Sequence, residues 1–315
     1  MKITLFDSWR KFSQPIINHW EELGHEVLFN PTWEQAQPSD LIFFYQSDNA
    51  LVEFTQNKIP DVQTFKVYAQ CIDIEVWSGQ PFAVDWTKVS GCIFMAKHIR
   101  NYVLSKMTFP LNTKRALIKP GIDLEKWTLR PLEPLESRPI RRIAYVVGDR
   151  RIWDVKRLDI AFQLLKDLLT ADPKHIWQLH IRGTYSTHEQ YNHYCQYLEK
   201  DLGLEGNIVW YLDRVGDMNK WLDDKDYFLL PSTKEAFSFA TAEAMAKGIK
   251  PIINNWEGSK DTWNGFVCNT YGEMLAEILR GTYEPLKYRN YVNEHYNEAR
   301  YLAELTNFIL EEGGE

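Results

Sequence analysis

The stretch that decides the fold is Asp226-Tyr-Phe-Leu-Leu-Pro-Ser-Thr-Lys-Glu235-Ala-Phe-Ser-Phe-Ala-Thr-Ala-Glu243-Ala-Met-Ala-Lys-Gly248. Its apolar run at 227–230 is short enough for a buried parallel strand, which the Pro-Ser pair after it ends. Residues 238–247 are rich in Ala, Met and Glu and predict a helix, with Gly248 in the position of a C-terminal cap. Strand, loop and helix in this order predict one unit of an α/β fold.

Two carboxylates accompany the start of this helix. Glu235 falls in the loop before the helix and Glu243 lies inside it. The first N–H groups of a helix have no partner within the helix and suit the oxygens of a phosphate group. We therefore interpret the segment as a sugar-nucleotide site. The alternative is an ordinary strand–helix unit in which one glutamate is solvated and the other interacts with the helix dipole.

Composition indicates a globular protein. The chain has 315 residues, 44% of them apolar and 14% aromatic, which suggests two domains of ordinary size. No run approaches the roughly 18 apolar residues of a membrane span, so no integral membrane segment is expected. Four scattered cysteines argue against a disulfide framework or a zinc site and favour a cytoplasmic location. The net charge of −7 argues against a protein that coats nucleic acid or anionic membranes with its whole surface.

One basic stretch departs from this acidic balance. Residues 97–119 contain no Asp or Glu, and their charged side chains are Lys97, Arg100, Lys106, Lys114, Arg115 and Lys119, with His98 among them. The stretch is either a contact for a polyanion or a solvated basic face without a partner.

The order of the predicted elements indicates two doubly wound domains. Strands are expected at 1–7, 26–29, 40–45, 64–69, 91–95, 142–147, 176–181, 207–212, 227–230 and 251–254, and residues 117–123 are expected to form the last strand and turn of the first half. Helices alternate with these strands, which favours parallel sheets that bind ligands beyond the carboxyl ends of their strands. Three prolines between 131 and 139 resist both helix and central strand.

We therefore predict an N-terminal domain at 1–130, a linker at 131–140 and a C-terminal, nucleotide-sugar-binding domain at 141–287. A helix expected at 288–311 would carry the final segment, 288–315, back to the first domain.

With these features the sequence resembles the retaining glycosyltransferases of family four, which have the GT-B architecture: two Rossmann-like domains that face each other across a cleft. The resemblance covers the second half nearly end to end and the first half only at its edges. Its most specific element is the pair Glu235 and Glu243 in the context quoted above. It implies that Glu235 binds hydroxyl groups of the donor sugar and Glu243 the ribose. Phe237, Ser238 and Phe239, between the two glutamates, belong to the predicted donor-binding residues.

The donor phosphates are assigned to a basic loop after the first strand of the second domain. The run Gly148-Asp-Arg-Arg-Ile-Trp-Asp-Val-Lys156 resembles the family's Gly-Arg-x4-Lys loop, in which Arg151 and Lys156 have the matching spacing. The glycine sits two residues earlier than in the family, so Arg150 and Arg151 compete for the role. Two cations here would neutralise a diphosphate and the charge that grows on it during the reaction. The alternative is a basic surface loop.

Further donor contacts are implied at two other strand ends. Gly183 and Thr184 end the strand that approaches the nucleotide in the family. Arg214 and Val215 lie in the loop that resembles the family's base-reading loop.

The first domain departs most from the family pattern. Asp73 and Glu75 occupy the region where the family often has a cleft histidine, and we predict that Asp73 faces an acceptor hydroxyl or the donor sugar. The family's Gly-Gly pair after the first strand is missing, and Arg10 or Lys11 could replace its phosphate contact. Gly121 is expected to support a tight turn where the chain leaves this domain.

The predicted reaction is transfer of a sugar from a UDP- or GDP-sugar to an acceptor hydroxyl, with retention at the anomeric carbon and without a metal ion or other cofactor. The acceptor is a glycan, a small molecule, a nucleic acid or a lipid phosphate. One alternative is a transferase for polyanions such as phage-type modified DNA, a teichoic-type polymer or a lipid phosphate. Another is a non-catalytic sugar-nucleotide binder. A nicotinamide oxidoreductase is disfavoured because neither domain opens with Gly-x-Gly-x-x-Gly.

Overall fold

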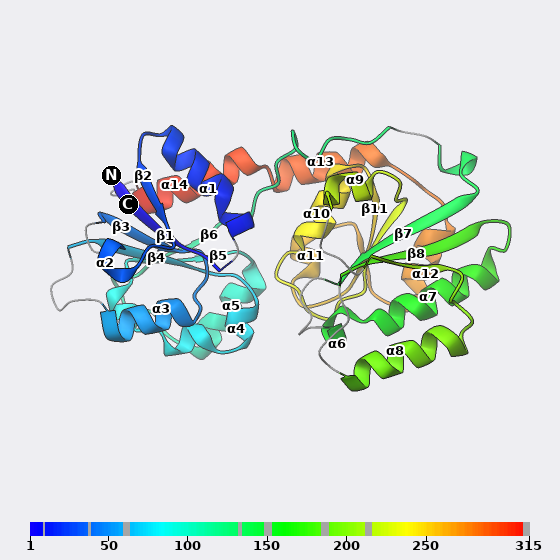
Figure 1. The fold of residues 1–315 in the computed structure, drawn as a ribbon, viewed down its shortest axis with the longest axis horizontal. Helices are drawn as coiled ribbons and strands as arrows, with labels where there is room; N and C mark the ends of the chain where they lie inside the picture. Colours follow the sequence, from blue (N-terminus) through cyan, green and yellow to red (C-terminus); the bar gives the residue numbers. More distant parts are fainter. Residues whose placement is uncertain are drawn as a thin grey trace. The chain divides into compact units, whose positions relative to one another are not determined.

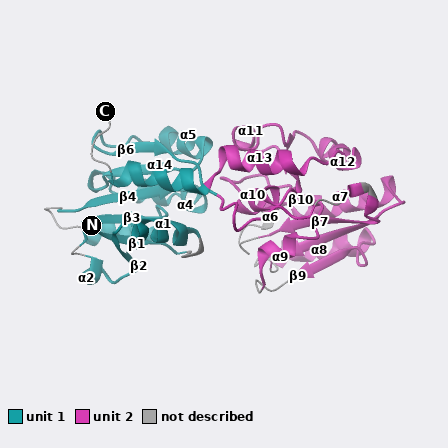
Figure 2. Ribbon diagram, turned by 90° about the horizontal axis from the view of Figure 1, so that it is seen from above, with its two compact units in different colours: residues 1–121, 298–315 teal, residues 122–297 magenta. Residues whose placement is uncertain are grey.

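The structure is a computed structural model that describes residues 1–8, 10–36, 39–58, 64–131, 134–147, 153–183, 189–211 and 216–310. The chain forms two compact units (Figures 1 and 2). Unit 1 comprises Met1–Gly121 and Glu298–Glu315, and unit 2 comprises Ile122–Asn297. In the described part of the chain, no helix combines the length and the apolar character that a membrane crossing requires.

Unit 1 contains a six-stranded sheet in the order β2-β1-β3-β4-β5-β6, and its strand pairs are parallel. The strands are β1 Lys2–Phe6, β2 Glu26–Phe29, β3 Leu41–Phe44, β4 Lys66–Cys71, β5 Gly91–Phe94 and β6 Lys114–Leu117. The helices are α1 Arg10–Glu22, α2 Trp33–Ala36, α3 Asn49–Glu53, α4 Ile74–Trp77, α5 Lys97–Lys106 and α14 Glu298–Leu310. A π-helical turn at Phe54–Lys58 and 3-10 turns at Gln80–Ala83 and Trp86–Lys88 complete the unit.

The last helix of the chain is part of unit 1. In α14, the hydroxyl of Thr306 accepts a hydrogen bond from the Trp20 indole at 3.0 Å, and the ring of Phe308 packs edge-on against Tyr68 of β4 at 5.8 Å. Gly121 lies beside this helix, where an added Cβ would stand 2.5 Å from the Cα of Glu298. Its φ lies outside the left-handed region, so the glycine is needed for close packing rather than for the expected tight turn.

The last strand of this sheet begins earlier than the sequence predicts. The sequence predicts the last strand and its turn at 117–123, whereas β6 spans Lys114–Leu117 and pairs with β5 in the register Gly91 with Lys114. The strand lies at the edge of the sheet, and its first two side chains, Lys114 and Arg115, are exposed. Charged edge strands discourage pairing with other chains, but they lack the apolar run that marks a buried strand.

Unit 2 contains a second six-stranded sheet in the order β12-β11-β10-β7-β8-β9, again with parallel pairs. Its strands are β7 Ile140–Val146, β8 Ile176–Arg182, β9 Ile208–Tyr211, β10 Tyr227–Leu230, β11 Lys250–Asn254 and β12 Val267–Cys268. Its helices are α6 Trp153–Lys156, α7 Leu158–Ala171, α8 Glu189–Asp201, α9 Met218–Leu222, α10 Phe239–Ala246, α11 Ser259–Thr262, α12 Tyr271–Leu279 and α13 Pro285–His295, with a 3-10 turn at Leu135–Ser137.

The core of unit 2 lies between its sheet and the helices α7 and α12. Helix α7 buries Leu158, Phe162, Leu165 and other residues at the three- and four-residue spacing of one helix face. These side chains pack with residues of β7, β8 and β10 in one cluster. In Figure 1, α7 and α8 lie on one side of this sheet and α10 and α13 on the other, the arrangement expected of a doubly wound domain.

The expected helix 288–311 is instead two helices, α13 and α14, separated at Tyr296 and Asn297. The backbone oxygen of Tyr296 accepts the N–H of Ile122 at 2.7 Å, and Asn297 forms a β-bridge with the same residue. The Tyr296 side chain is buried beside Phe237 and Trp263. Tertiary contacts therefore break a helix whose sequence contains neither glycine nor proline at this point.

The units divide at Gly121, before the linker predicted at 131–140. The described residues between Gly121 and β7 belong to unit 2 and pack within it. Trp127 is buried, and both Arg130 and Arg138 form ion pairs with the fully buried Asp226. The proline-rich composition therefore lies within a segment that is fixed by side-chain contacts rather than at the boundary between the units.

Candidate functional site

The segment 226–248 folds as predicted. Strand β10 is fully buried, and α10 begins one residue after Ser238. Ser238 has a left-handed backbone with φ of 73°, and its hydroxyl is 2.8 Å from that of Thr241 in the first turn of the helix. At the other end Gly248 has φ of 79°, the conformation of a C-terminal cap.

The carboxylate of Glu235 and the ammonium group of Lys156 form a buried ion pair at the carboxyl ends of β10 and β7. Only 8% of the Glu235 side chain and 12% of the Lys156 side chain are exposed. The hydroxyl of Ser232 donates a second hydrogen bond to the same carboxylate oxygen at 2.8 Å. The structure thus brings together two predicted site residues that lie 79 positions apart.

Hydrogen bonds from neighbouring segments fix the end of α6 and the loop after β10, which carry this pair. The Tyr145 hydroxyl donates a hydrogen bond to the backbone oxygen of Lys156 at 3.0 Å. The backbone N–H of Thr233 donates one to the backbone oxygen of Val155 at 2.9 Å. The side-chain amide of Asn254 donates to the backbone oxygen of Ser232 at 3.0 Å. Residues of β7, of β11 and of the loop after β10 therefore position the ion pair, as a preorganised site requires.

The second glutamate of the motif lies within α10. Glu243 is 6% exposed, in a helix whose residues 241–246 are all buried. The guanidinium of Arg289 donates to the backbone oxygen of Ala246 at 2.6 Å and so satisfies one of the last carbonyls of the helix. Glu243 is therefore held on a rigid, buried helix.

Three further predicted donor residues are described by the structure. Gly183 follows β8 with φ of 141° and donates its N–H to the backbone oxygen of Tyr211 at 3.1 Å. The ring of Phe237 is 3% exposed and packs against Trp263 at 5.2 Å and Phe239 at 5.1 Å. The Phe237 side chain thus supports the loop from inside. The predicted residues Arg150, Arg151, Thr184, Arg214 and Val215 lie outside the described part of the chain.

The candidates in unit 1 differ in their surroundings. Asp73 is half-buried before α4, where its carboxylate accepts the indole N–H of Trp77 at 2.9 Å. Glu75 is 3% exposed, and its carboxylate accepts backbone N–H groups of Ile72 and Asp73. Burial, with a contribution from the neighbouring Asp73 charge, raises the pKa of Glu75 to about 7. Glu75 therefore belongs to the local framework, and Asp73 is the more accessible carboxylate.

Sequence reasoning missed the residues that support the ion pair. Ser232 stands in the quoted stretch, three residues before Glu235, and this spacing was the available signal. The contacts of Tyr145 and Asn254 come from other strands and carry no such signal.

Among the described residues, His, Cys, Asp and Glu side chains form no group of three that could hold a metal ion. The four cysteines are buried and free.

The site lies in a segment that a known family describes. Residues 141–283 match the family model of the glycosyl transferases group 1. This segment is of the group 1 glycosyltransferase type. This segment includes the ion pair, α10 and Gly183, so that the described donor-site candidates of unit 2 all fall within it. A search of curated protein sequences found no match.

Solved structures with the same fold include three whose matches cover most of this chain. HepE of Anabaena, in complex with UDP and glucose, has a TM-score of 0.74 at 15% identity and covers 98% of this chain and 99% of its own. A glycosyltransferase from Rickettsia africae has a TM-score of 0.73 at 13% identity, with 99% of both chains covered. TarM of S. aureus, in complex with Fondaparinux, alpha-GlcNAc-glycerol and UDP, has a TM-score of 0.67 at 15% identity.

The TarM match covers 86% of this chain, which spans only 55% of TarM. At these identities the likeness concerns the fold. The two parallel six-stranded sheets with flanking helices are those of the GT-B architecture.

Proposed function

We propose that the protein transfers a sugar from a nucleotide-diphosphate donor to an acceptor hydroxyl, with retention at the anomeric carbon. The observation that carries this proposal is the buried pair of Lys156 and Glu235 at the carboxyl end of a parallel sheet, within the group 1 segment. Ligands of doubly wound sheets bind at this end. The free cysteines agree with a reducing, cytoplasmic setting.

In this proposal Lys156 binds the donor diphosphate. Its ammonium group is largely sheltered from water, where an ionic interaction with phosphate is stronger than at the surface. Arg151 or Arg150 would supply a second cation from the loop before α6. The positive end of α10, an eight-residue helix, would add the N–H groups of its first turn.

The two glutamates would hold the sugar and the nucleoside. A carboxylate accepts two hydroxyl protons at once, and each such charge-assisted bond contributes about 1.5–3 kcal/mol when it is sheltered from water. When a donor occupies the site, Glu235 would exchange part of its contact with Lys156 for the hydroxyl groups of the sugar. Glu243 would bind the ribose, with Gly183 and Thr184 near the nucleotide and Arg214 and Val215 near the base.

The reaction would break the bond between the anomeric carbon and the phosphate oxygen and form a bond to the acceptor oxygen on the same face. The acceptor proton would move to the departing phosphate oxygen, so no protein nucleophile is required. Positioning and charge stabilisation would supply most of the rate. Asp73 would orient the acceptor hydroxyl or the donor sugar. The cations assigned to the diphosphate would act without a metal ion.

Donor turnover and product configuration test this proposal. The protein is incubated with UDP-glucose, and in parallel with GDP- and ADP-sugars, with and without candidate acceptors, and proton NMR follows the anomeric signals. We expect slow donor hydrolysis without acceptor and a product of unchanged anomeric configuration. Lys156→Ala and Glu243→Ala should abolish most turnover, whereas Lys166→Ala, at an exposed position of α7, should not. An inverted product, or parental rates in both site variants, would contradict the assignment.

A polyanionic acceptor is a second candidate, favoured by the surface of unit 1. Lys106 at the end of α5 and Lys114 and Arg115 on the edge strand β6 are exposed, within a stretch that contains no acidic residue. Phosphate contacts release counterions, so binding of duplex DNA or of a teichoic-type polymer should weaken steeply as salt increases. Charge reversal at Lys114 and Arg115 should reduce that salt dependence, with Lys166→Glu as the matched control. Salt-independent binding would exclude this candidate.

A further inference from the structure

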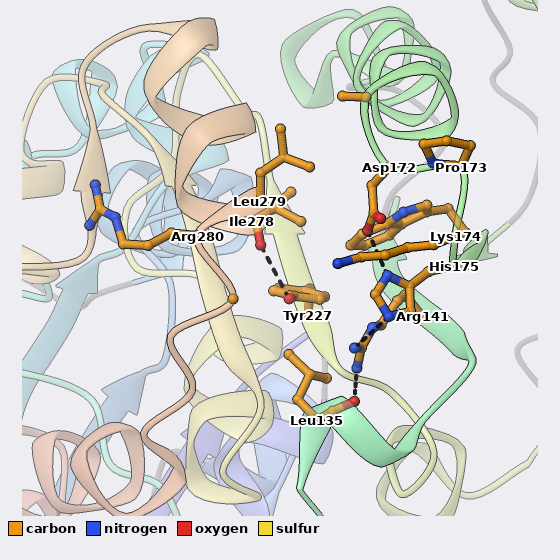
Figure 3. A pocket seen from close by; sticks show the side chains of 13 residues that line it. Leu135, Arg141, Asp172, Pro173, Lys174, His175, Tyr227, Ile278, Leu279 and Arg280 are labelled. Carbon is orange, nitrogen blue, oxygen red and sulfur yellow. Dashed lines mark hydrogen bonds and ion pairs between the residues drawn. The ribbon is translucent and has the colours of Figure 1, made fainter.

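A pocket of about 790 Å³ lies where β7, β8 and β10 begin, at the opposite end of the unit 2 sheet from the ion pair (Figure 3). Apolar side chains, among them Ile278 and the ring of Tyr227, form one wall. Arg141, Asp172, Lys174 and His175 line the other parts. Strand β7 rises about 3.3 Å per residue, so its first and last residues are about 20 Å apart. A ligand in this pocket would therefore not compete with a donor at the other end.

The guanidinium of Arg141 is the charged group at the base of this pocket. The residue is 5% exposed, and its two described hydrogen bonds go to the backbone oxygen of Leu135 and to the Nε2 atom of His175 at 3.1 Å. A guanidinium can only donate, so His175 accepts at Nε2 and carries its proton on Nδ1. That nitrogen lies 2.7 Å from the carboxylate of Asp172. The carboxylate of Asp172 thus accepts its hydrogen bond from His175. The described acceptors of Arg141, a backbone oxygen and an imidazole nitrogen, are both neutral.

Other cations at the same end of the sheet have carboxylate partners. Arg138 lies 2.7 Å from Asp226, and Arg130 lies 3.8 Å from the same carboxylate. Arg142, the next residue after Arg141, lies 3.7 Å from Asp224. Among the described residues, Arg141 has no carboxylate within ion-pair distance. Buried charges in proteins are normally paired, because removal of an ion from water is costly.

A second cation faces the same space. In Figure 3 the side chain of Lys174 extends across the pocket, with its ammonium group between His175 and the wall formed by Ile278 and Tyr227. The guanidinium of Arg280 points away from this space in the same view and pairs with Glu277 at 2.8 Å. Arg141 and Lys174 therefore provide the positive charge of the pocket.

We propose that this pocket binds a small organic anion, whose phosphate or carboxylate group lies between Arg141 and Lys174 and whose body rests on the apolar wall. The volume falls within the range of roughly 300–1,000 Å³ of small-molecule sites, and the combination of apolar wall and few charged groups is typical of them. The anion would supply the counter-charge that no described residue gives to Arg141. The site is separate from the proposed donor site.

Ligand-observed fluorine NMR tests the proposal with three matched probes: 4-fluorophenyl phosphate, 4-fluorobenzoate and the uncharged 4-fluorophenol. We expect saturable binding of at least one anion and none of the phenol. A preference for the phosphate probe would indicate a phosphate ester as ligand, and a preference for the benzoate a carboxylate. Binding should persist in the presence of saturating UDP and in Lys156→Ala, so that this test is independent of the donor site.

Two substitutions and one control locate the binding. Arg141→Met and the exposed Lys174→Glu should each weaken binding about tenfold, the factor that corresponds to 1.4 kcal/mol. Lys166→Glu makes the same charge change on the exposed surface of α7 and should leave binding unchanged. Because Lys174 is exposed, its variant keeps the test valid if Arg141→Met fails to fold. Absence of saturable binding up to millimolar concentrations, competition by UDP, or equal effects of the two glutamate variants would overturn the proposal.

Discussion

Replacement of Lys156 by methionine tests the energetic role of the buried ion pair. The change keeps the length of the side chain and removes its charge, so that the carboxylate of Glu235 stays buried without its cation. Removal of one partner of a buried pair costs about 3–5 kcal/mol, because the remaining charge is uncompensated. The 12% exposure of Lys156 and the hydrogen bond from Ser232 place the expected loss at the lower end, about 3 kcal/mol.

A double-mutant cycle separates this coupling from lost packing. Glu235→Gln removes the charge of the partner, and the double variant with Lys156→Met contains neither charge. For residues in contact, the double variant should be more stable than the sum of the single effects predicts, by about 0.5–3 kcal/mol. Urea unfolding of the four proteins at pH 7, followed by circular dichroism, measures these free energies. Lys166→Met, at an exposed position, should change stability by less than about 0.5 kcal/mol. Additive single effects, or a Lys156→Met protein as stable as Lys166→Met, would refute the reasoning.

Two further predictions concern stability. Burial raises the pKa of Glu75 from 4.5 to about 7, so folding favours its protonated form, and the contribution of this group to stability should fall by about 3 kcal/mol between these pH values, at about 1.36 kcal/mol per unit. Glu75→Gln cannot titrate and lacks this loss, so thermal unfolding from pH 5 to 8 should show the variant gaining stability relative to the parent as the pH rises. If the unfolding temperatures of the two proteins changed with pH in parallel, the raised pKa of Glu75 would be contradicted. Gly248→Ala should destabilise the protein by about 1–3 kcal/mol more than Gly203→Ala, since both glycines have positive φ but only at Gly248 would a Cβ lie 2.8 Å from other side chains. Equal urea midpoints for the two variants would show that the packing at Gly248 relaxes without cost.

Local chemistry explains which features the sequence could predict. The segment from β10 to α10 combines a short apolar run, a Pro-Ser stop, an alanine-rich helix and a terminal glycine, so each local preference favours the same structure. The structure places its strand and helix within one residue of the expected positions. The sequence therefore predicts Glu235 and Glu243 as site residues from this segment, and Lys156 from the resemblance of the loop at 148–156 to that of the family.

Features set by distant contacts could not be predicted in the same way. The contact between Lys156 and Glu235 joins strand ends 79 residues apart, and family spacing indicated both residues but not their ion pair. The break at Tyr296 depends on a backbone bond to Ile122, and no residue at that point disfavours a helix. Among the described residues Arg141 has no carboxylate partner, because Asp172 bonds to His175 instead, and this arrangement needs the folded sheet.

Titration of the protein with UDP and GDP tests the central claim most directly, because it reports on the nucleoside diphosphate site without knowledge of the sugar or the acceptor. Calorimetry should show one of the two nucleotides binding at a single site. Lys156→Ala should weaken this binding by about tenfold or more, since a charge-assisted bond to phosphate contributes about 1.5–3 kcal/mol, and Glu243→Ala should weaken it by a similar factor, whereas Lys166→Ala should bind like the parent. Failure of both nucleotides to bind, or unchanged affinity in both site variants, would contradict the account.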